Sequence, residues 1–258
     1  MLIDSHCHLD RLDLSPYNGD LDAALNAARE RGVERMLCIG IDRGNAQAVI
    51  DIASRNSDIY ASVGIHPLDL SDNVEPSEAL VALADNENVI AIGETGLDYY
   101  YSQDNKAAQQ ESFRNHLRAA AKTGKPAIVH TRNAREDTLA IIREASDPDV
   151  AGVLHCFTES REMAHAALDL NFYISFSGII TFKNAADLRD VVASVPMDRI
   201  LVETDSPYLA PVPFRGKKNE PKYVVEVAQC VAEIKGISYD QVVAQTADNF
   251  NRLFKLAA

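Results

Sequence analysis

Two histidines separated by one residue stand near the start of the chain, directly after an apolar segment. That segment predicts a short buried strand over residues 2–5, and side chains alternate between the two faces of a strand. His6 and His8 would therefore share one face, while Cys7 points to the opposite face and packs there. Two imidazoles on one face are half of a metal site. A lone His-x-His pair is, however, as often just two polar residues beside a loop.

Further residues of metal-binding type follow other apolar segments in the same way. They are Glu94, His130, His155 and Asp205. Each has an ordinary alternative, since a histidine at a strand end can simply be hydrogen-bonded and an acidic residue there can shape a turn. That all six positions are structural is improbable, so we interpret them as ligands. Four imidazoles and two carboxylates suit borderline divalent metals. They are too many for one four-coordinate ion, which predicts two ions about 3.5–4 Å apart with a bridging carboxylate.

The elements that would position these residues repeat along the whole chain, without a linker or a change of composition. Apolar runs alternate with amphipathic segments, a pattern that predicts a parallel sheet covered by helices on both faces. The predicted strands are 2–5, 34–41, 59–65, 89–93, 126–129, 152–154, 172–176 and 200–204. The predicted helices are 20–31, 45–55, 77–84, 103–123, 137–144, 161–169, 185–194, 224–235 and 239–254.

Eight strand–helix units predict an α/β protein with a (β/α)8 TIM barrel of the metal-dependent hydrolase type, as a single domain over residues 1–258. A doubly wound open sheet is the alternative, because a count of units does not prove closure. In a barrel the carboxyl ends of all strands open onto one face, where the active sites of this fold lie. The six candidate ligands would therefore converge there.

Charge limits the partners that the protein can have. A net charge of -13 argues against broad electrostatic binding to nucleic acid or to an anionic membrane, so a polyanionic substrate would have to be held locally. The chain has no long apolar run, no signal segment and four scattered cysteines. These features predict a cytoplasmic protein with reduced thiols and no membrane association. Nothing in the sequence indicates an obligate protein partner.

Five motifs in order resemble the TatD family of metal-dependent deoxyribonucleases, which belong to the amidohydrolase-like barrels. The motifs are Asp4-Ser5-His6-Cys7-His8-Leu9-Asp10, Gly64-Ile65-His66-Pro67, Gly93-Glu94-Thr95-Gly96-Leu97-Asp98-Tyr99, His155-Cys156-Phe157 and Glu203-Thr204-Asp205-Ser206-Pro207-Tyr208. The resemblance runs from residue 1 to about residue 254. It implies that one metal is held by His6, His8, Glu94 and Asp205, and the other by Glu94, His130 and His155, with Glu94 as the bridge. Relatives in the wider superfamily often bridge with a carbamylated lysine, so Glu94 favours the nuclease branch.

The resemblance also implies hydrolysis of phosphodiester bonds in DNA, and we expect an exonuclease that acts on single-stranded ends with two Zn, Mn or Mg ions. Glu94 and Asp205 are the expected catalytic residues, with Asp205 accepting the proton of the attacking water and returning a proton toward the leaving oxygen. Asp4 and Glu203 each precede a ligand by two residues on the same strand face. They are expected to orient ligating imidazoles or a bound water, unless Asp4 only lines the pocket floor.

Substrate contacts are expected from loops on the same face of the barrel. The candidates for phosphate binding are His66, Arg132, Lys183, Arg215, Lys217 and Lys218. The candidates for base stacking are Tyr99, Phe157, Tyr208 and Phe214. Without metal the two carboxylates would repel DNA, whereas two divalent ions make the site positive. His116 and His165 fall in predicted helices and receive no role.

The sequence leaves three alternative functions open. The same binuclear barrel can hydrolyse an amide, a lactone or another small ester, and the family resemblance also allows an aminoacyl-tRNA ester. A metal-stabilised binding protein is the alternative that is not an enzyme. The basic run at residues 215–218 and the bridging Glu94 favour the nuclease. A panel of single-stranded DNA, small esters and aminoacyl-tRNA would separate these functions.

Overall fold

The computed structural model describes residues 1–70 and 74–256. Eight strands form one sheet in chain order, and each pairs in parallel with the next. The strands are β1 (Leu2–Cys7), β2 (Val33–Cys38), β3 (Ile59–Val63), β4 (Val89–Asp98), β5 (Ala127–Arg132), β6 (Gly152–Leu154), β7 (Phe172–Phe176) and β8 (Ile200–Val202). Sequential parallel pairing is the strand order of a barrel rather than that of a doubly wound sheet.

The first and last strands meet where the candidate ligands lie. The Asp205 amide donates to the His6 carbonyl at 2.9 Å, and the His8 amide donates to the Ser206 carbonyl at 2.8 Å. A parallel bridge joins Cys7 to Ser206. These contacts make the sheet a nearly closed barrel, so the prediction of a (β/α)8 barrel is confirmed and the open-sheet alternative is excluded.

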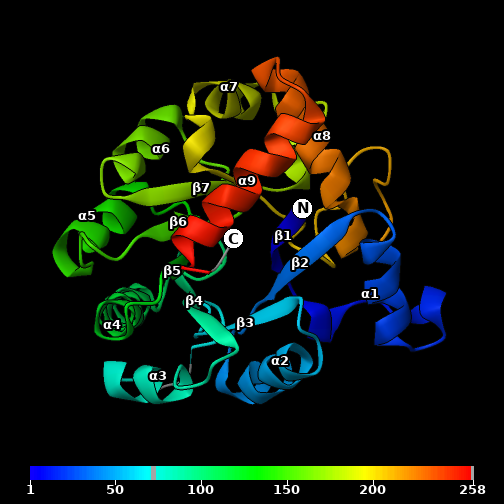
Figure 1. Cartoon of the computed structure of the whole chain (residues 1–258). Coiled ribbons are helices and arrows are strands. Elements are labelled where there is room, and N and C mark those ends of the chain that lie inside the picture. The colour runs from blue at the N-terminus through cyan, green and yellow to red at the C-terminus, as the bar shows by residue number, and fades with distance from the viewer. Residues whose placement is uncertain (71–73, 257–258) are drawn as a thin grey trace.

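Helices separate the strands and form an outer ring around them (Figure 1). The helices are α1 (Leu21–Arg29), α2 (Arg43–Arg55), α3 (Ser77–Leu83), α4 (Lys106–Thr123), α5 (Arg135–Ala145), α6 (Arg161–Leu168), α7 (Ala186–Ser194), α8 (Val224–Lys235) and α9 (Tyr239–Leu253). Local chemistry sets several of their ends: Asp20 caps α1, and Ser238 and Gln241 form a capping box at α9. None of the helices in the described ranges is long and apolar enough to cross a membrane.

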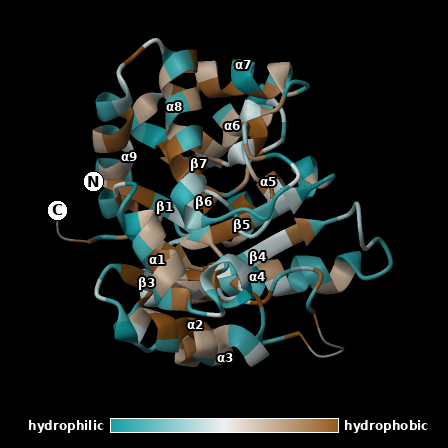
Figure 2. Cartoon of the chain, turned by 90° about the vertical axis from the view of Figure 1, so that its right-hand side faces the viewer, coloured by the Kyte–Doolittle hydropathy of each residue, from teal (hydrophilic) through white to brown (hydrophobic). Residues whose placement is uncertain are grey.

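Helix α9 crosses one end of the barrel, the end at which the N terminus lies (Figure 1). Its Phe250 and Phe254 pack against Ile3, Ile90 and Ile128, which stand near the starts of β1, β4 and β5. In the side view this end, with α9, is at the left, and hydrophilic residues colour much of the outer helices (Figure 2). The opposite end carries the loops that follow the strands, and it is the open end of the barrel.

Strands β4 and β5 are longer than predicted. The sequence predicts that Glu94 and His130 follow their strands, but both lie inside them. The pairing of β4 with β5 continues from Thr95 opposite Val129 to Asp98 opposite Arg132. Backbone hydrogen bonds to a neighbouring strand, which an apolar pattern does not reveal, therefore extend the sheet beneath the site.

Candidate metal centre

All six predicted ligands gather at the open end around the carboxylate of Glu94. His6 and Glu94 lie in strands β1 and β4, and His8 and Asp205 come directly after or close behind β1 and β8. The remaining two, His130 and His155, lie in β5 and directly after β6. The barrel thus brings together residues that are up to 199 positions apart in the sequence, between His6 and Asp205.

One oxygen of Glu94 faces the ligands from the closing strands. Its Oε2 lies 3.4 Å from His6 Nε2 and 3.9 Å from His8 Nε2. Asp205 Oδ1 lies 3.7 Å and 3.3 Å from the same two nitrogens. In a tetrahedral site with bonds of 2.0–2.1 Å, neighbouring donors are about 3.3 Å apart. These four donor atoms therefore have the spacing that encloses one ion.

The other oxygen of Glu94 faces a second group of imidazoles. Its Oε1 lies 2.8 Å from His155 Nε2, 3.4 Å from His66 Nε2 and 3.5 Å from His130 Nδ1. The two oxygens of one buried carboxylate thus belong to different groups of donors. This is the arrangement that a carboxylate bridging two ions requires.

In the second group, the contact made by the ring nitrogen that faces away from Glu94 distinguishes the imidazoles. It makes His130 and His155 candidate ligands and His66 a hydrogen-bond donor. His130 Nε2 lies 3.1 Å from Asp98 Oδ2, and His155 Nδ1 lies 3.4 Å from Glu203 Oε1. A carboxylate accepts the proton of the nitrogen beside it, which leaves the lone pair of the other nitrogen free for a metal. Without a metal, His155 Nε2 is hydrogen-bonded to Glu94 Oε1 at 2.8 Å, and the carboxylates of Glu94 and Glu203 raise the pKa of His155. A bound ion would displace that proton, and both imidazoles would then offer a lone pair on the side of Glu94.

His66 has the opposite tautomer. Its Nδ1 accepts the Leu68 amide at 3.2 Å, while the carboxylate of Asp69, at 3.8 Å, is beyond hydrogen-bonding distance. A neutral imidazole with a lone pair on Nδ1 carries its proton on Nε2. Burial lowers the pKa of His66 to about 4, so the ring is neutral at pH 7. Its Nε2–H therefore points into the centre as a donor, as a phosphate contact requires.

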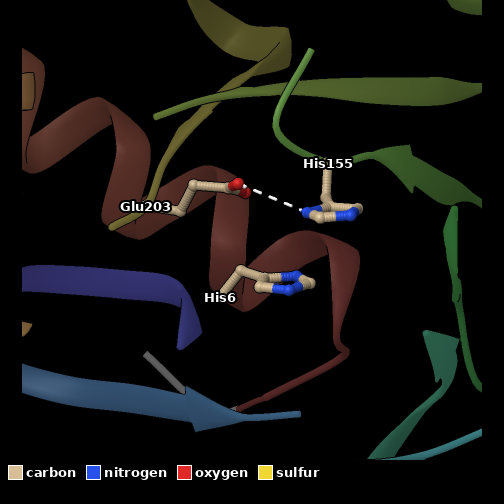
Figure 3. Close-up of side chains that lie close together, drawn as sticks. All are labelled: His6, His155 and Glu203. Carbon is tan, nitrogen blue, oxygen red and sulfur yellow. Dashed lines mark hydrogen bonds and ion pairs between the residues drawn. The ribbon is translucent and has the colours of Figure 1, made fainter. Parts of the chain in front are cut away.

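The buried polar atoms of the centre fit a cation. Neither ring nitrogen of His6 nor Nδ1 of His8 has a hydrogen-bond partner among the described residues, although these atoms are buried. The His6 and His155 rings are nearly parallel, with centroids 3.9 Å apart, and Glu203 points at His155 (Figure 3). Buried polar atoms without partners cost free energy, and bound divalent ions would remove that cost. Donor types and burial together fit two divalent ions.

Electrostatics keep both candidate carboxylates charged. Burial opposes ionisation of Glu94, yet the charge and hydrogen bond of His155, together with a hydrogen bond from His6, hold the pKa of Glu94 well below the usual range. Burial likewise opposes ionisation of Asp205, and His8 and His6 lower its pKa. Both groups are therefore anions at neutral pH, the state in which they bind metals.

The backbone holds Asp205 in an unusual conformation. Its φ of 55° lies in the left-handed region, which aspartate tolerates better than most residues. Its amide donates to His6, and its carbonyl accepts the Tyr208 amide at 2.9 Å. The buried side chain of Asn219 donates to the carbonyls of Thr204 and Tyr208 at 2.8 Å and 2.6 Å. These bonds fix the direction of the Asp205 side chain.

The two acidic residues that precede ligands have different surroundings. Glu203 lies against the His155 ring and also accepts the Cys156 amide at 2.8 Å, as an orienting residue would. Asp4 touches no imidazole; it accepts the Thr204 amide at 2.9 Å and the Thr204 hydroxyl at 2.6 Å. Burial raises the pKa of Asp4 to about 8. Asp4 therefore ties β1 to the end of β8, and its surroundings match the pocket floor rather than an imidazole partner.

Two supporting residues have no role in the sequence-based prediction. Asp98 accepts from His130, and its position four residues after Glu94 on the same strand face was a usable signal. Buried His116 accepts the Ile65 amide on Nε2 at 2.9 Å, while its Nδ1 lies 2.7 Å from the Ser112 carbonyl. It holds the backbone next to His66, and no sequence signal separates it from other helical histidines.

Among the described residues, the arginines and lysines proposed for phosphate make no ion pair or hydrogen bond with the six candidate ligands, whereas His66 Nε2 lies 3.4 Å from Glu94 Oε1. Arg132 ends β5 and stacks on Tyr100. Arg215 lies 3.7 Å from the Phe182 ring centroid and donates to the Ala210 carbonyl at 3.2 Å. Lys217 and Lys218 are exposed. Within the described residues no contact joins the 215–218 run to the six ligands, so phosphate binding there stays a prediction.

Most of the aromatic residues predicted to stack on bases are unavailable. Tyr99 and Phe157 are buried, so the prediction is wrong for both. The Phe214 ring is already stacked on Tyr223, with centroids 3.9 Å apart. Tyr208 is 51% exposed, and its ring centroid lies 5.9 Å from that of His8. Burial of a loop residue depends on tertiary packing that the sequence pattern does not show.

Comparison with known proteins gives the family of the chain. The family model described as TatD related DNase matches residues 3–255. The chain is 50% identical over 257 residues to a protein of Escherichia coli K12 named uncharacterized metal-dependent hydrolase YcfH, covering 100% of this chain and 97% of that protein. It is 32% identical to a Klebsiella pneumoniae protein named 3'-5' ssDNA/RNA exonuclease TatD, covering 94% of this chain and 95% of that protein.

A solved structure is similar over nearly the same length. The crystal structure of YJJV, a TatD homologue from Escherichia coli K12, superposes with a TM-score of 0.90 at 28% identity, covering 99% of this chain and 98% of that one. The family model and the relatives therefore span the whole barrel and the strands that carry all six candidate ligands. The chain belongs to the family of TatD-related DNases.

Proposed function

We propose that this protein hydrolyses phosphodiester bonds in DNA as an exonuclease on single-stranded ends, with two divalent ions. The observation that carries the proposal is the carboxylate of Glu94, whose two oxygens face two separate groups of donors. The Klebsiella relative, named as an exonuclease on single-stranded DNA and RNA, supports the choice of substrate.

His6, His8, Glu94 and Asp205 would hold one ion. Glu94, His130 and His155 would hold the other. When bound, these ions would act as Lewis acids toward the phosphodiester and lower the pKa of the attacking water. The protein supplies the orientation of each ligand, through Asp98 behind His130 and Glu203 behind His155.

Glu94 and Asp205 differ in their exposure to solvent, and this difference indicates which of them accepts the proton of the attacking water. The Glu94 side chain is 4% exposed and that of Asp205 is 14% exposed. A proton acceptor for water has to be reached by that water, so Asp205 takes the proton and later returns it toward the leaving oxygen. His66 Nε2–H donates to a phosphoryl oxygen, where charge develops in the transition state.

Charge explains why the ions matter for binding as well as for reaction. The protein carries a net charge of -13, and its two ligating carboxylates are anions. Divalent ions reverse the sign of the centre, so they should supply affinity for DNA. Chelated protein should accordingly bind a single-stranded oligonucleotide more weakly than metal-loaded protein, in an anisotropy titration. Equal affinity would contradict this part of the proposal.

The activity is tested on a panel of substrates with the metal-loaded protein. We expect shortening of single-stranded DNA labelled at the 3' or 5' end, and little turnover of small carboxylic esters, amides or aminoacyl-tRNA. Parallel reactions with Zn, Mn and Mg, together with elemental analysis, identify the activating ion. Turnover of an ester or of aminoacyl-tRNA without cleavage of DNA would replace the proposed reaction by another hydrolysis at the same centre.

A further inference from the structure

Exposed apolar side chains gather at the open end of the barrel. Of the large ones that are exposed among residues 1–70 and 74–256, only Met1 lies away from the loops after β3, β4 and β8. Those on the loops are Leu68, Tyr100, Tyr101, Tyr208 and Val212. Single exposed apolar residues are common, but a group on one face indicates a binding surface.

Tyr100 and Tyr101 form the most exposed part of this group, at 55% and 64% exposure. Their ring centroids are 4.8 Å apart, and the planes are at 85°. The guanidinium of Arg132 lies 4.2 Å and 4.6 Å from the two centroids. Arg132 takes part in none of the arginine ion pairs of the described residues. The three side chains therefore make a preformed aromatic platform with a positive charge that forms no ion pair with a carboxylate of residues 1–70 or 74–256.

One carboxylate connects this platform to the candidate metal centre. Asp98 Oδ1 accepts the amides of Tyr100 and Tyr101 at 3.0 Å and 2.8 Å. Asp98 Oδ2 lies 3.1 Å from His130 Nε2. The same side chain thus fixes both the backbone of the two tyrosines and the orientation of a candidate ligand. Through this shared carboxylate the platform is a direct neighbour of the candidate centre.

We propose that Tyr100, Tyr101 and Arg132 bind a nucleobase of a single-stranded nucleic acid by stacking, next to the phosphodiester at the centre. This inference rests on the proposed function and names the part of the substrate that the platform recognises. Stacking is largely independent of the sequence and needs an unpaired base with a free face. It also adds affinity that the negative charge of the protein does not oppose, while Arg132 adds a cation for the ring and the phosphate.

The test combines changes in the protein with changes in the substrate. Single-stranded oligonucleotides carry an abasic nucleotide at each of the three positions nearest either end, and kcat/KM is compared with that of the intact strand. For at least one position the wild-type protein should prefer the intact strand by about fivefold or more, the effect of one stacked base. The Tyr100→Ala/Tyr101→Ala variant should lose this preference, while Tyr100→Phe/Tyr101→Phe, which keeps both rings, should retain it.

The outcomes separate this inference from the function on which it rests. An alanine variant that keeps the wild-type preference, or that slows equally on intact and abasic strands, overturns the platform alone. A wild-type protein that cleaves no strand overturns the proposed function and the platform with it. Because both rings are exposed, the variants should fold, and circular dichroism checks this. The single variant Tyr101→Ala removes the more exposed ring and provides a second, milder test.

Discussion

The same strands form an apolar layer at one end of the barrel and carry candidate metal ligands toward the other end. Near the starts of β1, β4 and β5, Ile3, Ile90 and Ile128 pack against helix α9 in a closed apolar layer. Two to four residues further along these strands stand His6, Glu94 and His130. The closed end gains stability from apolar burial, whereas the open end holds polar atoms that lack partners. A change at one end should therefore affect stability, and a change at the other should affect activity.

The largest effect on activity is expected from Asp205→Asn at the open end. Asparagine keeps the shape of the side chain but cannot accept a proton and is a weaker ligand. We expect kcat on single-stranded DNA to fall by up to about 10⁴-fold, the upper range for loss of a general base. The thermal midpoint should change little, because the side chain touches only the centre. Near wild-type turnover would remove Asp205 as the proton acceptor.

Phe250→Ala should show the opposite behaviour at the closed end. Phe250 is fully buried between α9 and the starts of the strands. Truncation of a buried phenylalanine leaves a cavity and costs about 3–5 kcal/mol of unfolding free energy. Urea unfolding measures the loss, while kcat at a temperature where the variant is folded should stay within a few-fold of wild type. A large drop in kcat would mean that the two ends are coupled.

The sequence was most informative where chemistry and strand periodicity coincide. His6, Glu94 and His130 were predictable because polar residues of ligand type interrupt apolar strands, and the barrel rule then places them together. Burial in loops was not predictable: adjacent residues Tyr99 and Tyr100 look alike in the sequence, but packing buries the first and exposes the second.

Histidine tautomers and unusual backbone conformations are even harder to predict from the sequence. The left-handed φ of Asp205 depends on hydrogen bonds from distant segments. The proton on His66 Nε2 depends on a single amide, that of Leu68. Such contacts are made by the folded chain and have no local pattern, so the roles of individual histidines within the centre required the structure.

A matched pair of variants tests whether His155 binds a metal ion and whether His66 acts only as a hydrogen-bond donor. His155→Ala removes a candidate ligand whose Nε2 lies 2.8 Å from Glu94 Oε1, so we expect one of two bound ions to be lost in elemental analysis. His66→Ala removes only an N–H donor, so both ions should remain while kcat/KM falls about 10²-fold. Loss of an ion from the His66 variant would instead make His66 a ligand.

The last effect is a change of stability with pH and concerns His116, a buried residue of α4 that supports the open end. Burial lowers its pKa to about 4 from an ordinary value near 6.5. Between these values the unfolded chain binds a proton that the folded protein does not, so stability falls as the pH decreases. The stabilising contribution is therefore complete above pH 6.5 and is lost progressively as the pH falls toward 4.

One such group changes the unfolding free energy by up to about 1.4 kcal/mol per pH unit within that window. His116→Gln has no ring to protonate, but it can still accept from the Ile65 amide and donate to the Ser112 carbonyl. Urea unfolding from pH 4.5 to 8 should therefore show a shallower slope for the variant below pH 6.5 and parallel curves above it. Equal slopes throughout would show that His116 is protonated as readily in the folded protein, and that its bond to the Ile65 amide does not persist in solution.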